Sequence, residues 1–431
     1  MKILVIGGGG REHCIAWKIS NSEGNIKLFS IPGNPGMEEL GECFSIDLKD
    51  ENFKNIVDFV EEKEINFTVV GPEAPLVDGI VDCFEASGHK IFGPNKKASK
   101  IEGSKVFTKE LCKKYKIPTA DSIKFNRLDY RDALKYIHNL KEDNYPIVIK
   151  ADGLAAGKGV VVAESRQQAV SAVEDCFVKR VFGKSGDSII IEEFIKGFEV
   201  SILCLCDGKN IVPMVLAQDY KKILDGDEGK NTGGMGSYSP VPMVDESIYK
   251  KIMYEIIYPT YDGLCREGIL YKGILYGGII ISNSQPYLLE YNCRFGDPES
   301  QVILPRLLDD FLELLINCSE GNLAQTKLRW DDSKCVCVVT ASRGYPESSS
   351  KGDEISGIEI FKKEKDIYIF HAGTKKDNGK LYTNGGRVLN IVSKGRTFKE
   401  ARKKVYNAVS MINFEGMQYR KDIALRAEER W

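Results

Sequence analysis

The stretch PIVIKADGLAAGKGVVV, residues 146–162, decides how the rest of the chain is interpreted. Two runs of β-branched residues flank a loop of small residues, which predicts two strands joined by a glycine-rich turn. Lys150 and Lys158 stand at the two ends of this loop. Because glycines let backbone N–H groups approach oxygen atoms and lysines supply positive charge, the pattern favours a flap that covers phosphates. An ordinary surface hairpin is the alternative. The glycines concerned are Gly153, Gly157 and Gly159.

This flap differs from a Walker A loop, which has four residues between its glycines and then Gly-Lys-Ser/Thr before a helix. Gly153 and Gly157 bracket three residues, Gly159 replaces the Ser/Thr, and a strand is predicted to follow. No hydroxyl is therefore placed to hold a metal ion, and metal ligands have to come from another part of the chain.

Composition excludes several classes of protein. The length of 431 residues predicts about three domains. Sixty basic and 62 acidic residues leave a net charge of -2, which gives no electrostatic case for nucleic acid or an anionic membrane as partner. The twelve cysteines include no Cys-x-x-Cys pair, and no signal peptide or apolar run near twenty residues occurs. We therefore expect a protein of the reducing cytoplasm.

The N-terminus reads as the start of a doubly wound parallel sheet. A buried strand at 2–6 leads into a glycine turn and a helix, a combination that forms a natural anion site, with Gly9, Gly10 and Arg11 as candidate ligands. A tight turn without a ligand is the alternative. A dehydrogenase is disfavoured because Glu12 stands where a dinucleotide fingerprint has its third glycine.

Two further candidates follow in the same region. Glu73 comes after the predicted strand 67–70, at the edge where ligands of parallel sheets bind, and could bond a sugar hydroxyl or an amine. Capping of the next helix is its alternative role. Lys105 opens a helix, where the helix dipole disfavours a cation, so it is a functional candidate beside the alternative of a solvated lysine.

A pair of hard-oxygen ligands lies at the end of a predicted hairpin. Glu290 and Asn292 are two apart on a strand and therefore share a face, and Arg294 continues it. A carboxylate and an amide oxygen suit magnesium on a nucleotide, and the arginine suits a carboxylate or phosphate. Earlier in the chain, the acidic end of the strand 188–195 could read an adenine, and the small-residue loop 231–238 could bind a ligand.

These motifs, in this order, resemble the ATP-grasp ligases and, more narrowly, the phosphoribosylamine–glycine ligase family. The resemblance covers essentially the whole chain. It implies three domains: an N-terminal doubly wound α/β domain (1–102), a central ATP-grasp domain (103–325, with a lid at about 119–195) and a small, mostly β C-terminal domain (326–431). The matching blocks are GGREH (9–13), VGPEAPL (70–76), IKADGLAAGKG (149–159), NTGGMG (231–236), NCRFGDPE (292–299) and FHAGT (370–374).

The resemblance implies an ATP-dependent ligase that joins glycine to 5-phospho-β-D-ribosylamine through glycyl phosphate, in purine biosynthesis. It implies catalytic roles for Lys150, Arg294 and Asp219, and a metal site of Glu290 and Asn292 for Mg²⁺ or Mn²⁺. The residues implied for ATP are Lys105, Lys150, Gly153, Gly157, Lys158, Gly159, Glu192, Glu193, Ile195 and Glu199. Those implied for glycine and the phosphoribosylamine are Gly9, Gly10, Arg11, Glu73, Asp219, Lys222, Asn231, Gly233 and Arg294.

The sequence departs from the family pattern at Gly8, Tyr220 and Lys230, where Asn, His and Pro are expected. None of these removes an implied ligand. Two other functions remain open: a sister ATP-grasp ligase of purine metabolism that takes bicarbonate or formate, and a non-catalytic nucleotide-binding regulator. A stand-alone enzyme, as a monomer or weak homodimer, is expected.

Overall fold

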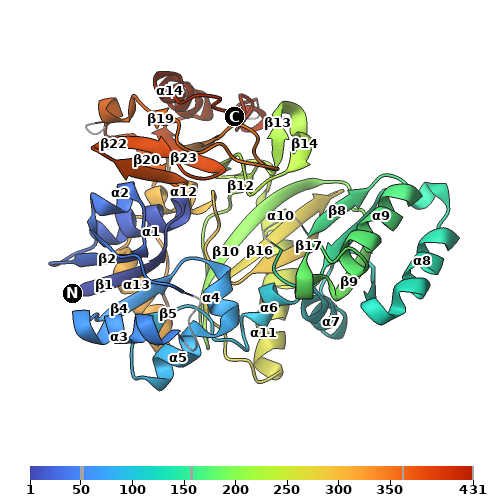
Figure 1. Cartoon of the computed structure of the whole chain (residues 1–431). Coiled ribbons are helices and arrows are strands. Elements are labelled where there is room, and N and C mark those ends of the chain that lie inside the picture. The colour runs from blue at the N-terminus through green and yellow to red at the C-terminus, as the bar shows by residue number, and fades with distance from the viewer. Residues whose placement is uncertain (49–52, 156–158, 362–363, 430–431) are drawn as a thin grey trace.

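The computed structural model describes residues 1–48, 53–155, 159–361 and 364–429. Three lobes adjoin a central antiparallel sheet: the N-terminal lobe, a lid built from residues of the green part of the chain, and the C-terminal lobe (Figure 1). No helix in the described residues combines the length and the apolar character needed to cross a membrane.

The N-terminal lobe contains a parallel sheet, as predicted, with five strands in the order β3-β2-β1-β4-β5. Alternate residues of β1 point to opposite faces. Ile3 and Val5 pack with α1, whereas Leu4 and Ile6 pack with α3 and α5, so helices cover both faces. The elements are β1 (Lys2–Gly7), α1 (Gly10–Ser20), β2 (Lys27–Pro32), α2 (Pro35–Glu38), β3 (Gly41–Cys43), α3 (Lys54–Lys63), β4 (Phe67–Val70), α4 (Glu73–Asp78), α5 (Ile80–Ala86) and β5 (Ile91–Phe92).

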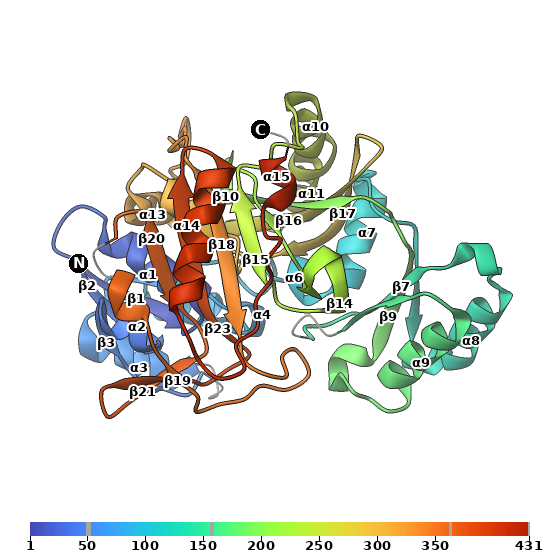
Figure 2. The same cartoon turned by 90° about the horizontal axis from the view of Figure 1, so that it is seen from above.

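The lid is a four-stranded antiparallel sheet, order β6-β9-β7-β8, that stands away from the other lobes (Figure 2). Ile147, Ile149 and Ala151 of β7 form a core with α8 and α9, so the intervening residues of β7 face the other way. The elements are β6 (Ser122–Asn126), α8 (Tyr130–Asn139), β7 (Ile147–Ala151), β8 (Val160–Ala163), α9 (Arg166–Phe177) and β9 (Ser188–Glu193).

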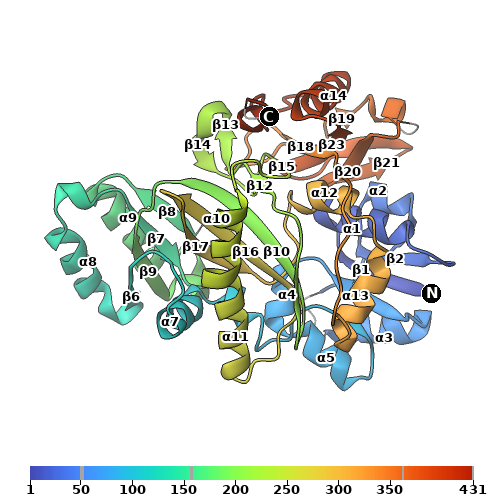
Figure 3. The same ribbon diagram turned by 180° about the vertical axis from the view of Figure 1, so that it is seen from behind.

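The central sheet, order β11-β10-β16-β17, has a helix along one face (Figure 3). This helical stretch consists of α10, a π-helical segment Ile252–Ile257 and α11 in succession. Pro259 follows the π segment and lacks the N–H that a regular α-helix would use there. The elements are α6 (Lys100–Gly103), α7 (Lys105–Tyr115), β10 (Phe198–Asp207), β11 (Ile211–Pro213), α10 (Glu246–Lys251), α11 (Tyr258–Arg266), β16 (Lys272–Ser282), β17 (Gln285–Asn292), α12 (Ser300–Ile303) and α13 (Phe311–Glu320).

The C-terminal lobe contains a five-stranded sheet, order β12-β15-β18-β23-β20, of which β12 and β15 come from the middle of the chain. This pairing brings the loop between β14 and β15 close to β23. Its elements, with a small second sheet and a hairpin, are β12 (Gln218–Asp219), β13 (Lys222–Leu224), β14 (Glu228–Asn231), β15 (Gly236–Ser239), β18 (Lys334–Ala341), β19 (Glu354–Ile355), β20 (Ile367–His371), β21 (Thr374–Asp377), β22 (Lys380–Thr383), β23 (Arg387–Gly395), α14 (Phe398–Met411) and α15 (Leu425–Glu428).

Candidate active site

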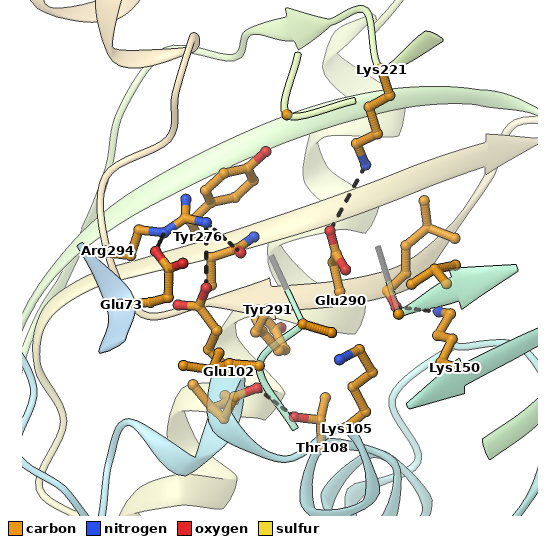
Figure 4. Close-up of a pocket in the computed structure, with 18 of the residues that line it drawn as sticks. Glu73, Glu102, Lys105, Thr108, Lys150, Lys221, Tyr276, Glu290, Tyr291 and Arg294 are labelled. Carbon is orange, nitrogen blue, oxygen red and sulfur yellow. Dashed lines mark hydrogen bonds and ion pairs between the residues drawn. The ribbon is translucent and has the colours of Figure 1, made fainter. Parts of the chain in front are cut away.

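A cavity of about 380 Å³ lies where the lid, the central sheet and both terminal lobes meet (Figure 4). Its walls carry many charged side chains of both signs. Eleven of the residues singled out in the sequence line it, although they come from segments up to 283 positions apart (11 to 294). They are Arg11, Glu73, Lys105, Lys150, Gly159, Glu192, Asp219, Gly233, Glu290, Asn292 and Arg294.

Lys150 reaches the cavity because it lies on the face of β7 that the lid helices leave uncovered. Its Nζ donates to the carbonyl of Leu289 at 3.1 Å and pairs with Glu192 Oε2 at 2.8 Å. The pairing register of β17 shifts between Glu290 and Leu288, which leaves Leu289 as a bulge. Bulges redirect backbone groups next to functional sites, and this one connects the lid to the central sheet.

Lys105 stands at the first position of α7, immediately after the N-cap Ser104. Its Nζ donates to the carbonyl of Gly153 at 3.2 Å, so its ammonium lies at the root of the glycine-rich flap. Asp152 accepts hydrogen bonds from Ser104 Oγ and from the N–H of Val106, which ties the flap to this helix end. Burial lowers the pKa of Lys105, and Glu290 opposes that shift.

Glu290 and Asn292 share one face of β17 and both line the cavity. Burial would raise the pKa of Glu290, but Lys221, Lys150 and Lys105 reverse the shift, so the carboxylate is held ionised. Lys221 Nζ lies 3.9 Å from Glu290 Oε1, and Arg294 donates to Asn292 Oδ1 at 3.2 Å (Figure 4).

The donor set fits a hard divalent cation bound together with a nucleotide. One ionised carboxylate and one amide oxygen on the same face provide two hard ligands, and phosphate oxygens can supply the others. Within the described residues no group of three or more His, Cys, Asp and Glu side chains could hold a metal by itself. Such a site therefore depends on the nucleotide.

Arg294 joins the N-terminal lobe to the central sheet. Its Nε donates to Glu73 Oε2 at 3.1 Å, and its Nη2 lies 3.4 Å from Glu102 Oε1. Burial alone would raise the pKa of Glu73, but Arg294 and Arg11 hold it at about 2. Glu73 is the first residue of α4, and its carboxylate points at Arg294 (Figure 4).

The carboxylate of Glu12 occupies the glycine turn at the N-terminus. Glu12 accepts from the N–H of Gly9 at 2.7 Å and from Arg11 Nε at 2.6 Å, and Arg11 Nη1 donates to the carbonyl of Phe295. A Cβ on Gly10 would lie 2.1 Å from Asn390 Nδ2, so glycine is needed where α1 meets the C-terminal sheet. The N–H of Gly9 is thus already satisfied, whereas Arg11 lines the cavity.

The other site residues that the family resemblance implied lie outside this cavity or outside the described residues. Glu193, at the end of β9, accepts from the N–H of Asp121 at 3.2 Å, and Glu199 pairs with Lys221 at 2.7 Å. Ile195, Asn231 and Lys222 do not line the cavity. Gly157 and Lys158 lie outside the described residues.

Several cavity residues were missed from the sequence. Lys221, and not its neighbour Lys222, lines the cavity, because consecutive residues of extended chain point to opposite sides. Asp297 pairs with Arg387 at 2.8 Å, and Glu299 accepts from the hydroxyl of Tyr276 at 2.5 Å. Asp297 and Glu299 lie in the GDPE segment of a block that matched the family, but no local feature of the sequence indicated Arg387. The others that were missed are Glu102 and Lys109.

Asp219 stands apart from the other cavity acids. Its carboxylate has no hydrogen-bond or ion-pair partner among the residues that the structure describes, whereas Glu73, Glu192, Asp297 and Glu299 each have one. Burial, with Glu299, Glu199 and Glu290 nearby, outweighs Lys221 and raises the pKa of Asp219 to about 8.

This pKa gives a prediction for the ligand-free protein. The unfolded chain releases the Asp219 proton near 3.8, but the folded chain retains it up to about 8, so raising the pH between these values favours unfolding. We expect the Tm advantage of Asp219→Asn over the unchanged protein to grow between pH 4.5 and pH 8. Thermal unfolding at both pH values measures it, with the exposed Asp262→Asn as control. A constant or shrinking advantage would contradict the assigned environment.

The lid sheet, which lines the same cavity as the strand that carries Glu290 and Asn292, defines the class: this is an ATP-grasp fold. Comparison with known proteins narrows it. The phosphoribosylglycinamide synthetase N domain matches residues 1–102, its ATP-grasp (A) domain residues 103–300 and its C domain residues 335–426. The chain belongs to the phosphoribosylglycinamide synthetase family.

Individual relatives agree with this membership. The phosphoribosylamine–glycine ligase of Caldanaerobacter subterraneus is 49% identical over 98% of this chain and 99% of its own length, and that of Haemophilus influenzae is 46% identical over 100% and 99%. The crystal structure of the Thermotoga maritima ligase has a TM-score of 0.81 at 33% identity, covering 98% of this chain and 100% of that one. A biotin carboxylase domain from Hydrogenobacter thermophilus, in complex with MgADP and bicarbonate, shares the fold at 16% identity (TM-score 0.72, 97% and 91% covered).

Proposed function

We propose that this protein is an ATP-dependent ligase that joins glycine to 5-phospho-β-D-ribosylamine, giving glycinamide ribonucleotide, ADP and phosphate. The observation that carries the proposal is the meeting of Lys150 and Lys105 with Glu290 and Asn292 in one cavity, in a chain whose relatives bear that enzyme's name. The cations suit ATP phosphates, and the two oxygen ligands suit the metal that accompanies them.

The chemistry follows from the weakness of a carboxylate as an electrophile. A glycine carboxylate oxygen attacks the γ-phosphorus of ATP, the bond from that phosphorus to the bridging oxygen breaks, and glycyl phosphate and ADP result. The amine of phosphoribosylamine then attacks the acyl carbon, phosphate leaves, and the nitrogen loses a proton. Lys105 and Lys150 would hold the phosphates in line, where positioning and charge neutralisation supply most of the catalysis.

Glu290 and Asn292 would hold Mg²⁺ or Mn²⁺ together with the nucleotide. A metal ion bound there neutralises the charge that the phosphates carry. The orientation of Asn292 comes from Arg294, which donates to one side of its oxygen and leaves a second lone pair for the ion.

The nucleotide base would lie at the end of β9, against Glu193 and the backbone of Ile195, and Glu199 would bond the ribose. The sequence implied a similar role for Glu192, but its carboxylate lies between Lys109 and Lys150. We therefore assign Glu192 to holding these lysines. Gly153, Gly157, Lys158 and Gly159 would form the flap over the phosphates.

The two acceptor substrates would occupy the rest of the cavity. Asp219, Arg294 and the residues Thr232 and Gly233 would bind glycine, together with Lys221 in place of Lys222, since neither Asn231 nor Lys222 lines the cavity. Arg11 and Glu73 would bind the phosphoribosylamine. Because the N–H of Gly9 is already bonded to Glu12, Gly9 and Gly10 would shape this site more than they bind its phosphate.

Omission of single substrates tests the function. With ATP, glycine and phosphoribosylamine together we expect phosphate release and a product with the mass of glycinamide ribonucleotide, and neither when one of them is left out. Phosphate release with bicarbonate or formate replacing glycine would instead identify a sister ATP-grasp ligase. Nucleotide binding without phosphate release under any condition would identify a regulator.

The location and assembly proposed from the sequence fit this function. All twelve cysteines carry free thiols, as is usual in the reducing cytoplasm where small-molecule metabolism takes place. Separation by size with light scattering tests the expectation of a monomer or weak homodimer.

A further inference from the structure

One lysine of the cavity has no role in the reaction proposed above. Lys109 follows Lys105 by one turn of α7, and its side chain is only 11% exposed. Its helix lies where the chain enters and leaves the lid, since Thr119, shortly before β6, pairs with Leu288 of β17, and β9 contacts α7.

The Lys109 ammonium makes two hydrogen bonds and one ion pair. Its Nζ donates to Thr119 Oγ1 at 2.7 Å and to the carbonyl of Ala120 at 2.8 Å, and lies 3.2 Å from Glu192 Oε1. The Thr119 hydroxyl in turn donates to the carbonyl of Leu288, which links Lys109 to the central sheet. One side chain therefore fixes both the entering and the leaving strand of the lid to the body of the protein.

Lys109 also limits how far Glu192 offsets the positive charge of Lys150. Glu192 is 3% exposed and has one oxygen on each lysine, so two positive charges share a single negative charge. Lys150 donates to the carbonyl of Leu289 and pairs with Glu192, and no further partner of its ammonium occurs among the described residues. Without Lys109, Glu192 would neutralise Lys150.

We infer that Lys109 is a positioning residue for the nucleotide: it anchors the root of the lid and compensates Glu192, so that Lys150 presents a net positive charge to the phosphates. The inference rests on the proposed function only in taking the nucleotide to be ATP. Lys109 itself does not contact the reacting atoms.

Replacement of Lys109 by methionine, which has similar length and no charge, tests the inference. We expect a non-hydrolysable ATP analogue to bind about 10-fold more weakly, as for the loss of a charged hydrogen-bonding group, while the KM for glycine stays within about 2-fold. Binding of the analogue requires no turnover, so this result is independent of whether the ligase assay succeeds. Lys113→Met, an exposed lysine one turn further along α7, is the matched control and should bind normally.

A second variant separates charge from folding. In Lys109→Met/Glu192→Gln the carboxylate that would neutralise Lys150 is also removed, so we expect most of the lost affinity for the analogue to return. Three results would each overturn the inference. They are unchanged affinity of Lys109→Met for the analogue, a loss of affinity matched by an equal rise in the KM for glycine, and no recovery of affinity in the double variant. If Lys109→Met does not fold, the double variant is compared with Glu192→Gln instead. The inference predicts equal affinity of these two variants for the ATP analogue. Weaker binding by the double variant would contradict it.

Discussion

Glu290→Gln is expected to lower turnover on the order of 10³-fold at ordinary magnesium concentrations, as for the loss of a key electrostatic contact in an active site. The substitution keeps the size and one oxygen of the side chain but removes the negative charge. That charge is the one that Lys221, Lys150 and Lys105 stabilise, since they keep the pKa of Glu290 low in spite of burial. A neutral amide in its place binds a divalent cation weakly.

The measurement is kcat at several magnesium concentrations. Raising magnesium should restore part of the activity of Glu290→Gln, because the lost ligand weakens binding of the ion more than it disturbs the cavity. Glu246→Gln, on the exposed surface of α10, makes the same chemical change and should have normal activity. Full activity of Glu290→Gln at low magnesium would contradict the metal assignment.

Lys150→Met is expected to reduce kcat/KM for ATP by about 10²- to 10³-fold, since it removes a cation from the developing charge of the transferred phosphoryl group. The change also leaves Glu192, which is 3% exposed, with Lys109 as its remaining partner. Because Lys109 still compensates this carboxylate, the loss of stability should be smaller than the about 3–5 kcal/mol that leaving a buried charge unpaired costs, and the Tm should stay close to that of the unchanged protein.

The double variant Lys150→Met/Glu192→Gln distinguishes the two effects. It removes the buried carboxylate that both lysines share and leaves Lys109 without its ion-pair partner, so the Tm should fall below that of Lys150→Met while the activity remains low. Activity of Lys150→Met that falls only in proportion to a fall in its Tm would show that Lys150 only supports the fold. Circular dichroism melts and initial rates on the same samples give both quantities.

The parts of the fold that could be predicted are those with a local signal. Buried strands followed by glycine turns and helices specify the parallel sheet of the N-terminal lobe, and alternation in β7 places Lys150 opposite the lid helices. The joining of β12 and β15 to the C-terminal sheet could not be predicted, because Ser237 pairs with Cys337, a hundred positions away, and nothing in either segment encodes the partner.

The site divides in the same way. Glu290 and Asn292 could be placed on one face from strand periodicity alone. The choice between Lys221 and Lys222 depends on the orientation of a short extended segment, and a one-residue difference reverses it. The Arg387–Asp297 pair and the sharing of Glu192 by two lysines depend on tertiary packing, so no single stretch of sequence reveals them.

The most direct test of the central claim follows one oxygen atom. If glycine is activated as glycyl phosphate, an oxygen of its carboxylate leaves with the phosphate when the amine attacks. Glycine labelled with ¹⁸O in the carboxylate should therefore transfer one ¹⁸O to each phosphate released, as measured by mass spectrometry of that phosphate. Phosphate without label, formed at the normal rate alongside the amide product, would contradict the account.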